Sequence, residues 1–391
     1  GESFHTYWWP KEPVQLEGRR VGIVGTGATG IQIIAEIADK VGDLTVFQRR
    51  PNWSTPLNNR PISEEEMESI RSRYDEIFAN CEASAGGFEH VARRGFWDHT
   101  PEERRALWDE LYTQPGFSFF AGNFADVFFD KEANEEISEY VADRIRGRVD
   151  DPELAEKLIP RDHGFGLQRL PLETNYFEAY NRDNVHLVDV TATPIERVTT
   201  NGLQTTEGEF DLDLIIFATG FDAITGGYDL IDIRGVDGQT LADKWRESPS
   251  TYLGALCNGF PNMFMVAGPQ SVSGSTNFPR AIETGVDWQT ALIEHVRAEG
   301  KTRVEAEPEA EEAWVAEVVR AYDRLLLRRM RVGSLSIATC FQAPGPKVKS
   351  AGTPTWGHQP SWAAPQGSST QRTILRSSMR HAGRATHSSS T

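Results

Sequence analysis

The sequence of 391 residues predicts an α/β fold with a parallel sheet, and three observations lead to this class. Within residues 19–60, a short apolar strand is followed by a glycine-rich turn, a helix and a second strand. Residues 61–158 are mostly helical in character. Residues 185–327 change to strand-like runs and end in two long helical segments. Strands that alternate with helices along a chain are typical of a parallel sheet covered by helices.

The individual elements follow from local patterns. The first unit combines a strand at 21–24, a helix at 31–40 and a strand at 44–47. Ser63 is predicted to begin the next helix, because three glutamates follow it and an acidic first turn complements the helix dipole. The later elements are a strand at 185–188, a β-meander at 195–210 that turns at Asn201 and Gly202, strands at 214–217 and 263–266, and helices at 281–297 and 305–327.

Composition excludes several classes of protein. The hydrophobic fraction is 39% and the charged fraction 25%, as in globular proteins, and no apolar run is long enough to cross a membrane. A net charge of −17 disfavours nucleic acid or an anionic membrane as partner. Three scattered cysteines predict neither a disulfide framework nor a metal site, and they fit the reducing cytoplasm. The first residues contain no signal peptide and no initiator Met, so we expect a fragment.

Charge is distributed unevenly along the chain. All 57 acidic residues lie at or before Asp323, whereas ten of the 40 Lys and Arg residues follow it. Residues 1–323 therefore have a net charge of −27 and residues 324–391 one of +10. Residues 328–391 are rich in Ser, Gly, Pro, Arg and Thr without periodicity, which predicts a disordered basic tail.

The turn after the first strand has the spacing G-x-G-x-x-G of a Rossmann dinucleotide-binding site. Gly25 permits the tight turn, Gly27 lets the backbone approach a pyrophosphate, and Gly30 lets helix and strand pack closely. The start of the helix offers free N–H groups to the phosphates. A glycine-rich turn without a ligand is the alternative. The predicted cofactor-binding residues of this turn are Gly25, Thr26, Gly27, Ala28, Thr29 and Gly30.

The second strand selects the nucleotide. An NAD site would place Asp or Glu near its end, to accept hydrogen bonds from the ribose 2′-hydroxyl. Here Gln48, Arg49 and Arg50 stand at this place. A guanidinium binds a 2′-phosphate in a fork, whereas a carboxylate repels it. The sequence therefore predicts NADP, unless both arginines are solvated surface charges.

Residues 1–10 have the spacing G-x-x-x-H-x-x-x-W-P. This spacing resembles the fingerprint of the Baeyer–Villiger monooxygenases, F-x-G-x-x-x-H-x-x-x-W-P, without its leading Phe. The glycine turn, residues 168–176 and the run Ala218-Thr219-Gly220-Phe221-Asp222 resemble the same family. The resemblance covers about residues 1–327.

This family implies an enzyme that holds FAD and NADPH in separate domains and inserts one oxygen of O2 next to a ketone carbonyl, giving an ester or lactone. Arg169 matches its active-site arginine, a cation for negative charge that develops in the reaction. Without the resemblance, Arg169 is interpreted as a surface residue. The partners implied are a small ketone and O2, and we expect a monomer. Further implied cofactor contacts are Gln168, Ala218, Thr219, Gly220 and Asn277.

The resemblance also implies a domain plan. Residues 1–13 form an interdomain linker, 14–219 a Rossmann-like NADP-binding domain with a parallel sheet, a β-meander and a helical insertion at 61–158, and 220–327 the C-terminal part of an FAD-binding domain. The first FAD motif of the family, which precedes the fingerprint, is not found in the sequence. We therefore expect the chain to hold FAD poorly.

Three departures leave alternatives open. The family commonly has Lys where this chain has Gln168, and Thr or Ser where it has Arg50. Its C-terminal motifs are missing, although plausible codons for residues 331–340 and 350–357, read two nucleotides on, give similar segments. Residues 328–391 are therefore predicted to be disordered or a frame-shift product. The other functions considered are an N- or S-oxygenating flavin monooxygenase and an NADP-binding fragment without turnover.

Overall fold

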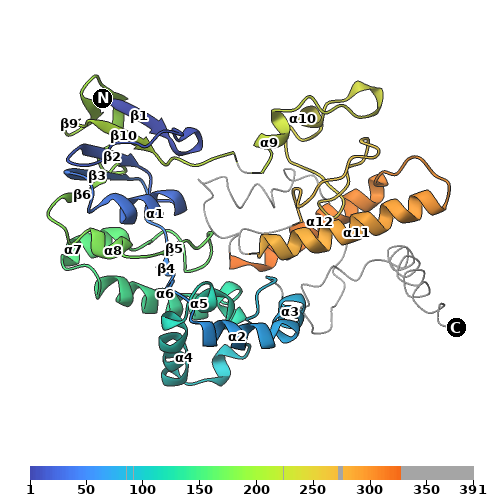
Figure 1. Cartoon of the computed structure of the whole chain (residues 1–391), viewed down its shortest axis with the longest axis horizontal. Helices are drawn as coiled ribbons and strands as arrows, with labels where there is room; N and C mark the ends of the chain where they lie inside the picture. The colour runs from blue at the N-terminus through green and yellow to red at the C-terminus, as the bar shows by residue number, and fades with distance from the viewer. Residues whose placement is uncertain (85, 91, 223, 272–275, 327–391) are drawn as a thin grey trace. The chain divides into compact units, whose positions relative to one another are not determined.

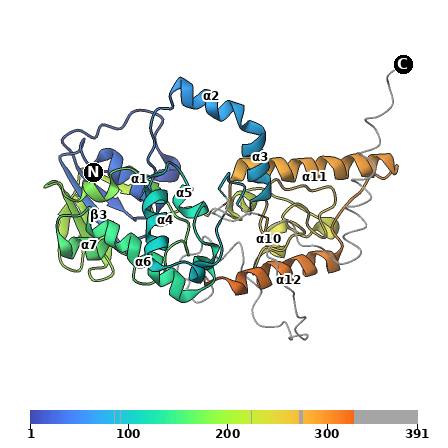
Figure 2. The same ribbon diagram turned by 90° about the horizontal axis from the view of Figure 1, so that it is seen from below.

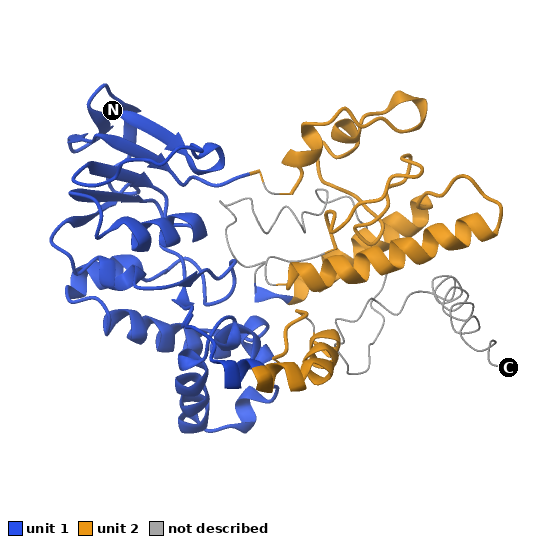
Figure 3. Cartoon of the chain, in the orientation of Figure 1, with its two compact units in different colours: residues 1–67, 92–221, 325–330 blue, residues 68–91, 222–324, 331–391 orange. Residues whose placement is uncertain are grey.

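The computed structural model describes residues 1–84, 86–90, 92–222, 224–271 and 276–326 (Figure 1). The predicted tail, 328–391, lies outside the described residues. The described residues form two compact units (Figure 3). Unit 1 contains Gly1–Met67 and Ala92–Phe221, with Leu325 and Leu326 after the last helix, and unit 2 contains Glu68–Val91 and Asp222–Arg324.

Unit 1 is built on a five-stranded sheet in the order β1-β10-β2-β3-β6, in which all neighbouring strands are parallel (Figure 1). The predicted α/β class with a parallel sheet is therefore confirmed. The strands are β1 (Glu2–His5), β2 (Arg20–Val24), β3 (Asp43–Gln48), β6 (Val185–Asp189) and β10 (Leu214–Phe217). Residues 1–13, expected to be a linker, thus contain an edge strand of the sheet, followed by the short helix η1 (Thr6–Trp8).

Both faces of this sheet are buried, because its side chains alternate between two apolar cores. Val21, Ile23 and Ile216 point to one core, which α1 (Ala28–Ile37) covers with its own isoleucines. Phe47 and Ile215 point to the other, under the β-meander. The central strands β2, β3 and β10 are consequently mainly apolar runs, which is why the sequence located them.

Helix α1 begins three residues earlier than predicted. Gly27 is its N-cap residue, and the Ile31 amide donates to the Gly27 carbonyl at 2.9 Å. The glycine motif therefore supplies the first turn of the helix as well as the turn before it. The helix ends at Ile37, where the Lys40 amide turns back to the Ile37 carbonyl.

The predicted β-meander consists of β7 (Ile195–Val198), β8 (Gly202–Thr205) and β9 (Glu209–Asp211), paired antiparallel. Its turn differs from the one expected. Neither Asn201 nor Gly202 has a positive φ, and Gly202 already belongs to β8. A Cβ on Gly202 would lie 1.9 Å from the Phe210 carbonyl oxygen. This glycine is therefore required by the close approach of β9 rather than by the turn.

The helical character predicted for 61–158 is confirmed, but this segment is divided between the units, since Glu68–Val91 lies in unit 2. Ser63 accepts a hydrogen bond from the Glu66 amide at 3.1 Å, as expected for a helix start. Helices α4 (Pro101–Thr113) and α6 (Lys131–Arg146) lie side by side, joined by an ion pair of 2.8 Å between Arg104 and Glu136 (Figure 2). The elements are α2 (Glu64–Ser72), α3 (Tyr74–Ala83), η2 (Phe96–Asp98), α4 (Pro101–Thr113), α5 (Ser118–Ala121), η3 (Ala125–Phe128), α6 (Lys131–Arg146), α7 (Pro152–Leu158) and α8 (Tyr176–Ala179), with β4 (Thr55–Pro56) paired to β5 (Leu172–Glu173).

The described part of unit 2 is helical and contains no strand. The two long helices predicted near its end are confirmed as α11 (Phe278–Ala298) and α12 (Pro308–Arg324). The strand predicted at 263–266 is wrong. A strand needs a neighbouring strand for its hydrogen-bond ladder, and these residues pair with no described strand. Instead, the Met265 amide donates to the Ala255 carbonyl in a loop, and Ala267 turns the chain with a φ of 54°. The shorter helices of this unit are α9 (Gly226–Asp229), η4 (Val236–Gly238) and α10 (Leu241–Lys244).

Candidate functional site

The glycine turn lies at the carboxyl end of β2, where parallel sheets bind nucleotides. Gly25 has a φ of 107°, and its amide donates to the Phe47 carbonyl of β3 at 3.0 Å. A Cβ on Gly25 would lie 2.6 Å from the Ala218 carbonyl oxygen, and one on Gly30 would lie 2.1 Å from the Gly25 carbonyl oxygen. Both positions therefore require glycine for packing and conformation.

Gly27 differs from these two glycines. Its φ of −76° is open to any residue, and a Cβ placed on it would have no atom within 4 Å. The chain thus leaves open space at the start of the ten-residue helix α1. The first-turn amides of this helix, those of Ala28, Thr29 and Gly30, belong to the groups that intrahelical bonds leave free. This arrangement fits the pyrophosphate of a dinucleotide, with room for its backbone approach and N–H donors beside it.

The end of β3 is bonded to this turn. The buried Thr26 hydroxyl donates to the Arg50 carbonyl at 2.8 Å. The Thr191 hydroxyl donates to the Arg49 carbonyl at 2.7 Å. The two arginines that follow β3 are therefore held next to the glycine motif by their backbone, while their side chains are exposed.

The side chains at the end of β3 have different partners. Gln48, expected to contact the cofactor, is buried, and its amide nitrogen donates to the Lys157 carbonyl at 2.7 Å. Its Oε1 atom is buried without a hydrogen-bond partner among the described residues. The Arg49 guanidinium forms no hydrogen bond or ion pair within the described ranges, and Arg50 pairs with Asp162 at 3.3 Å. Arg49 can therefore bind an anion without first breaking a contact to another side chain, whereas Arg50 cannot.

Arg169 and Gln168 lie in the loop between α7 and β5. The Asn52 amide donates to the Arg169 carbonyl at 3.3 Å, which places this backbone beside the segment that follows β3. The Arg169 side chain is exposed, and in the described parts of the chain its guanidinium has no partner. Two buried side chains fix the loop before it, since Trp53 donates to the His163 carbonyl and Asn134 to the Phe165 carbonyl, each at 2.9 Å.

Ala218, Thr219 and Gly220 follow β10, the strand next to β2. The Ala218 amide donates to the Val24 carbonyl at 2.9 Å, and Gly220 has a φ of 104°. Thr219 Oγ1 lies 3.2 Å from His5 Nε2. The Tyr7 amide donates to His5 Nδ1 at 3.1 Å, which leaves Nε2 as the protonated nitrogen that donates to Thr219.

Asn277 belongs to unit 2, whereas the other candidate residues belong to unit 1. It stands before α11, and its side-chain amide nitrogen donates to the Gly87 carbonyl at 3.0 Å.

The sequence did not predict a role for Asp162, Thr191 and Asn52, which hold the arginine-bearing segments. No local pattern marks them, because each contacts a residue more than 100 positions away in the sequence.

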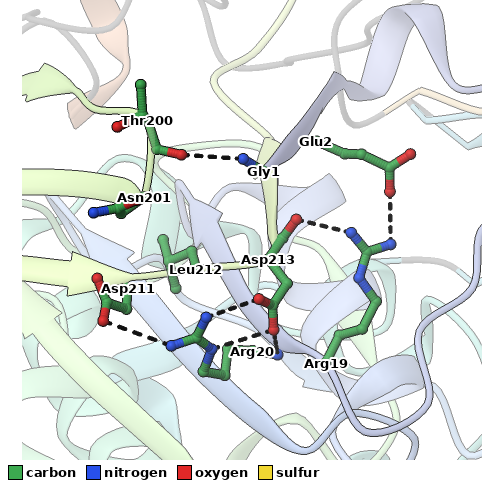
Figure 4. Close-up of a pocket in the computed structure, with 9 residues that line it drawn as sticks. All are labelled: Gly1, Glu2, Arg19, Arg20, Thr200, Asn201, Asp211, Leu212 and Asp213. Carbon is green, nitrogen blue, oxygen red and sulfur yellow. Dashed lines mark hydrogen bonds and ion pairs between the residues drawn. The ribbon is translucent and has the colours of Figure 1, made fainter.

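A polar concavity lies at the opposite, amino-terminal ends of β1, β2 and β10 (Figure 4). Its arginines are already neutralised, since Arg19 pairs with Glu2 at 2.7 Å and Arg20 with Asp213 at 2.8 Å. Hydrogen bonds from Arg20 lower the pKa of Asp213 to about 2. With its cations engaged, this concavity is poorly suited to a phosphate, in contrast to the carboxyl ends of the strands.

The sheet, the glycine turn and the strand-end arginines are the features of a Rossmann-type dinucleotide-binding fold. No protein-family model matches the chain. Two curated proteins are similar to it: a 2-oxo-Δ3-4,5,5-trimethylcyclopentenylacetyl-CoA monooxygenase of Pseudomonas putida, 46% identical over 84% of this chain, and an acetone monooxygenase (methyl acetate-forming) of a Gordonia strain, 43% identical over 81%. The aligned regions cover 61% and 60% of those two proteins, so the chain spans about three fifths of their length.

A crystal structure of OTEMO in complex with FAD and NADP matches the chain with a TM-score of 0.82 and 46% identity, covering 84% of this chain and 62% of that one. These similarities confirm the resemblance predicted from the sequence: the chain is a homologue of the Baeyer–Villiger monooxygenases. One relative has a different named activity, a phenazine N-monooxygenase of Lysobacter antibioticus that is 40% identical over 81% of this chain. Among the described residues, no helix is long and apolar enough to cross a membrane.

Proposed function

We propose that this chain is the NADP-binding part, with a portion of the flavin-binding part, of an FAD- and NADPH-dependent monooxygenase that inserts oxygen next to a ketone carbonyl. The observation that carries the proposal is the hydrogen bond from Thr26 to Arg50, which fastens an arginine pair to a glycine turn with open space at Gly27. Pyrophosphate and 2′-phosphate sites are then adjacent, as NADP requires. The relative solved with FAD and NADP bound supports the choice of cofactors.

Each candidate residue has a role in this proposal. The turn from Gly25 to Gly30 binds the pyrophosphate, and Arg49 and Arg50 bind the 2′-phosphate. The Arg169 guanidinium orients the nicotinamide and stabilises negative charge that develops on the reacting oxygen. FAD, when bound, supplies the oxygen chemistry. Gln168, Ala218, Thr219, Gly220 and Asn277 complete the proposed cofactor contacts.

The whole enzyme would use a small ketone and O2. We place it in the cytoplasm on the grounds of its few scattered cysteines, and we expect it to be a monomer. The family's first FAD motif is not in this sequence, so FAD binding by this chain is expected to be weak. Absorbance in the flavin bands after purification with added FAD measures this directly.

Calorimetry of the intact chain with NADPH and NADH tests the nucleotide site. We expect NADPH to bind more tightly, and Arg49→Gln to weaken NADPH about tenfold with little effect on NADH, since only NADPH has a 2′-phosphate. Arg60→Gln is the matched control, because Arg60 is exposed and paired with Glu66 in the same unit. Equal affinities for both nucleotides in the wild type would reject the arginine assignment.

A second candidate function is oxygenation of nitrogen, favoured by the phenazine N-monooxygenase relative. Both functions use the same nucleotide site, so binding data do not separate them. The gene's full reading frame, expressed with FAD and NADPH, should convert a cyclic ketone to a lactone, detected by mass spectrometry. Formation of a phenazine N-oxide without any lactone would favour the second candidate.

A further inference from the structure

The Arg50–Asp162 ion pair is a feature of the nucleotide site that its glycine motif does not explain. Asp162 Oδ2 lies 3.3 Å from Arg50 Nη1, and both side chains are partly exposed, at 42% and 45%. The contact joins the end of β3 to the loop after α7, across 112 positions of sequence. A carboxylate therefore stands beside one of the two cations proposed for the 2′-phosphate.

The Asp162 carboxylate is held in place by a buried neighbour. Its Oδ1 atom lies 2.7 Å from His163 Nδ1, and the His163 side chain is only 1% exposed. The His163 backbone is fixed in turn, because the buried Trp53 indole donates to its carbonyl. Most exposed ion pairs are loose and weak. Here one partner is anchored to the core, so its charge stays near Arg50.

This anchored charge affects one nucleotide more than the other. NADP(H) has a 2′-phosphate that is absent from NAD(H), and that phosphate must approach Arg50 while a carboxylate is already paired with its guanidinium. The carboxylate both competes for the guanidinium and repels the phosphate. The adenosine and pyrophosphate parts, which the two nucleotides share, bind at the glycine turn and are not affected in this way.

We infer that Asp162 is a specificity-determining residue, which weakens 2′-phosphate binding by occupying Arg50 and so limits the preference of this site for NADPH over NADH. The inference rests on the proposed NADP-binding function and deepens it. It also explains how the site can have two adjacent arginines without holding both free for a phosphate, since Arg49 is left as the main cation. If Asp162 instead oriented Arg50 for the phosphate, removing its charge would weaken NADPH binding.

The test is Asp162→Asn in the intact chain, with binding of NADPH and NADH measured by calorimetry. Asparagine keeps an oxygen that accepts from His163 Nδ1, so the loop retains its anchor while the charge is removed. NADPH should bind about threefold to tenfold more tightly, and NADH within about twofold of the wild type. Asp43→Asn is the matched control, since Asp43 stands at the opposite end of β3, where it pairs with His186 at 3.0 Å.

A second measurement, made in the Arg50→Gln variant, tests whether Asp162 acts through Arg50. There Asp162→Asn should raise NADPH affinity less than in the wild type, because the guanidinium that Asp162 occupies is gone. Weaker NADPH binding in Asp162→Asn, no change, or an equal change for both nucleotides would each overturn the inference while leaving the proposed function intact. A wild-type chain that binds neither nucleotide would instead refute the proposed function and the inference with it.

Discussion

The Thr26 hydroxyl donates to the carbonyl of Arg50 at 2.8 Å, although the two residues belong to different loops of the sheet. Thr26 follows β2 and Arg50 follows β3, and the register of these parallel strands brings their ends together. A buried hydroxyl without this partner would cost about 1–3 kcal/mol, so the bond fixes the relative position of the two loops. The positions proposed for the pyrophosphate and for the 2′-phosphate are thereby coupled through the backbone.

The glycines of the turn should respond differently to the same substitution. Gly27→Ser is expected to leave stability unchanged or slightly raised, since serine is a good N-cap residue and the space is open. It should weaken NADPH binding about tenfold, because its side chain fills the space proposed for the pyrophosphate. Gly30→Ser should lower the free energy of unfolding by about 1–3 kcal/mol through its clash with the Gly25 carbonyl. Urea denaturation measures the stability of each variant, and calorimetry measures its NADPH affinity. A loss of stability in Gly27→Ser would contradict the conclusion that the space beside Gly27 is open.

The Arg20–Asp213 pair should make stability depend on acid pH. The pKa of Asp213 is lowered to about 2 by hydrogen bonds from Arg20, so the pair's contribution is complete above about pH 4 and is lost as the pH falls through 2. Asp213→Asn should therefore lower the melting temperature at pH 7, with a difference from wild type that shrinks between pH 4 and pH 2. Asp211→Asn, at 3.7 Å from Arg20, is the control. A difference that persists undiminished at pH 2 would exclude this cause.

Arg148 neutralises a buried carboxylate. It contacts Glu173 at 2.7 Å, and the Glu173 side chain has no exposed surface. Arg148→Met should cost about 3–5 kcal/mol of unfolding free energy, because the Glu173 carboxylate is left buried without a counter-ion and keeps only its hydrogen bond from the Tyr176 amide. Arg60→Met, which removes an exposed pair with Glu66, should leave the free energy of unfolding nearly unchanged. Similar losses in the two variants, measured by urea denaturation, would show that burial of Glu173 is not the cause.

Cys257 should be unreactive in the folded chain. It is fully buried in the core of unit 2, and burial, with nearby Glu311, raises the pKa of its thiol to about 12. At pH 8 only about one thiol in ten thousand is then ionised, and the thiolate is the reactive form. Peptide mapping after iodoacetamide treatment should find Cys257 unmodified in native buffer and modified in urea. Labelling in native buffer would show that this core opens readily.

Features set by neighbouring residues could be predicted from the sequence. The spacing of Gly25, Gly27 and Gly30 specifies the turn because each requirement is local to the backbone or to the strand beside it. Mainly apolar runs located the central strands β2, β3 and β10, since strands buried on both faces have no polar alternation. The similarity to FAD- and NADPH-dependent monooxygenases was likewise visible in the motifs.

Only the tertiary structure decided which distant segments meet. It placed β1 beside β10 as an edge strand where a linker was expected, and it left residues 263–266 without a strand neighbour. It also buried Gln48 and set Asp162 against Arg50. These outcomes depend on pairings between residues far apart in the chain, and neither helical nor strand periodicity contains the identity of a distant partner. The sequence therefore determined the glycine turn and the arginines after β3, whereas packing determined which of those arginines is unpaired among the described residues.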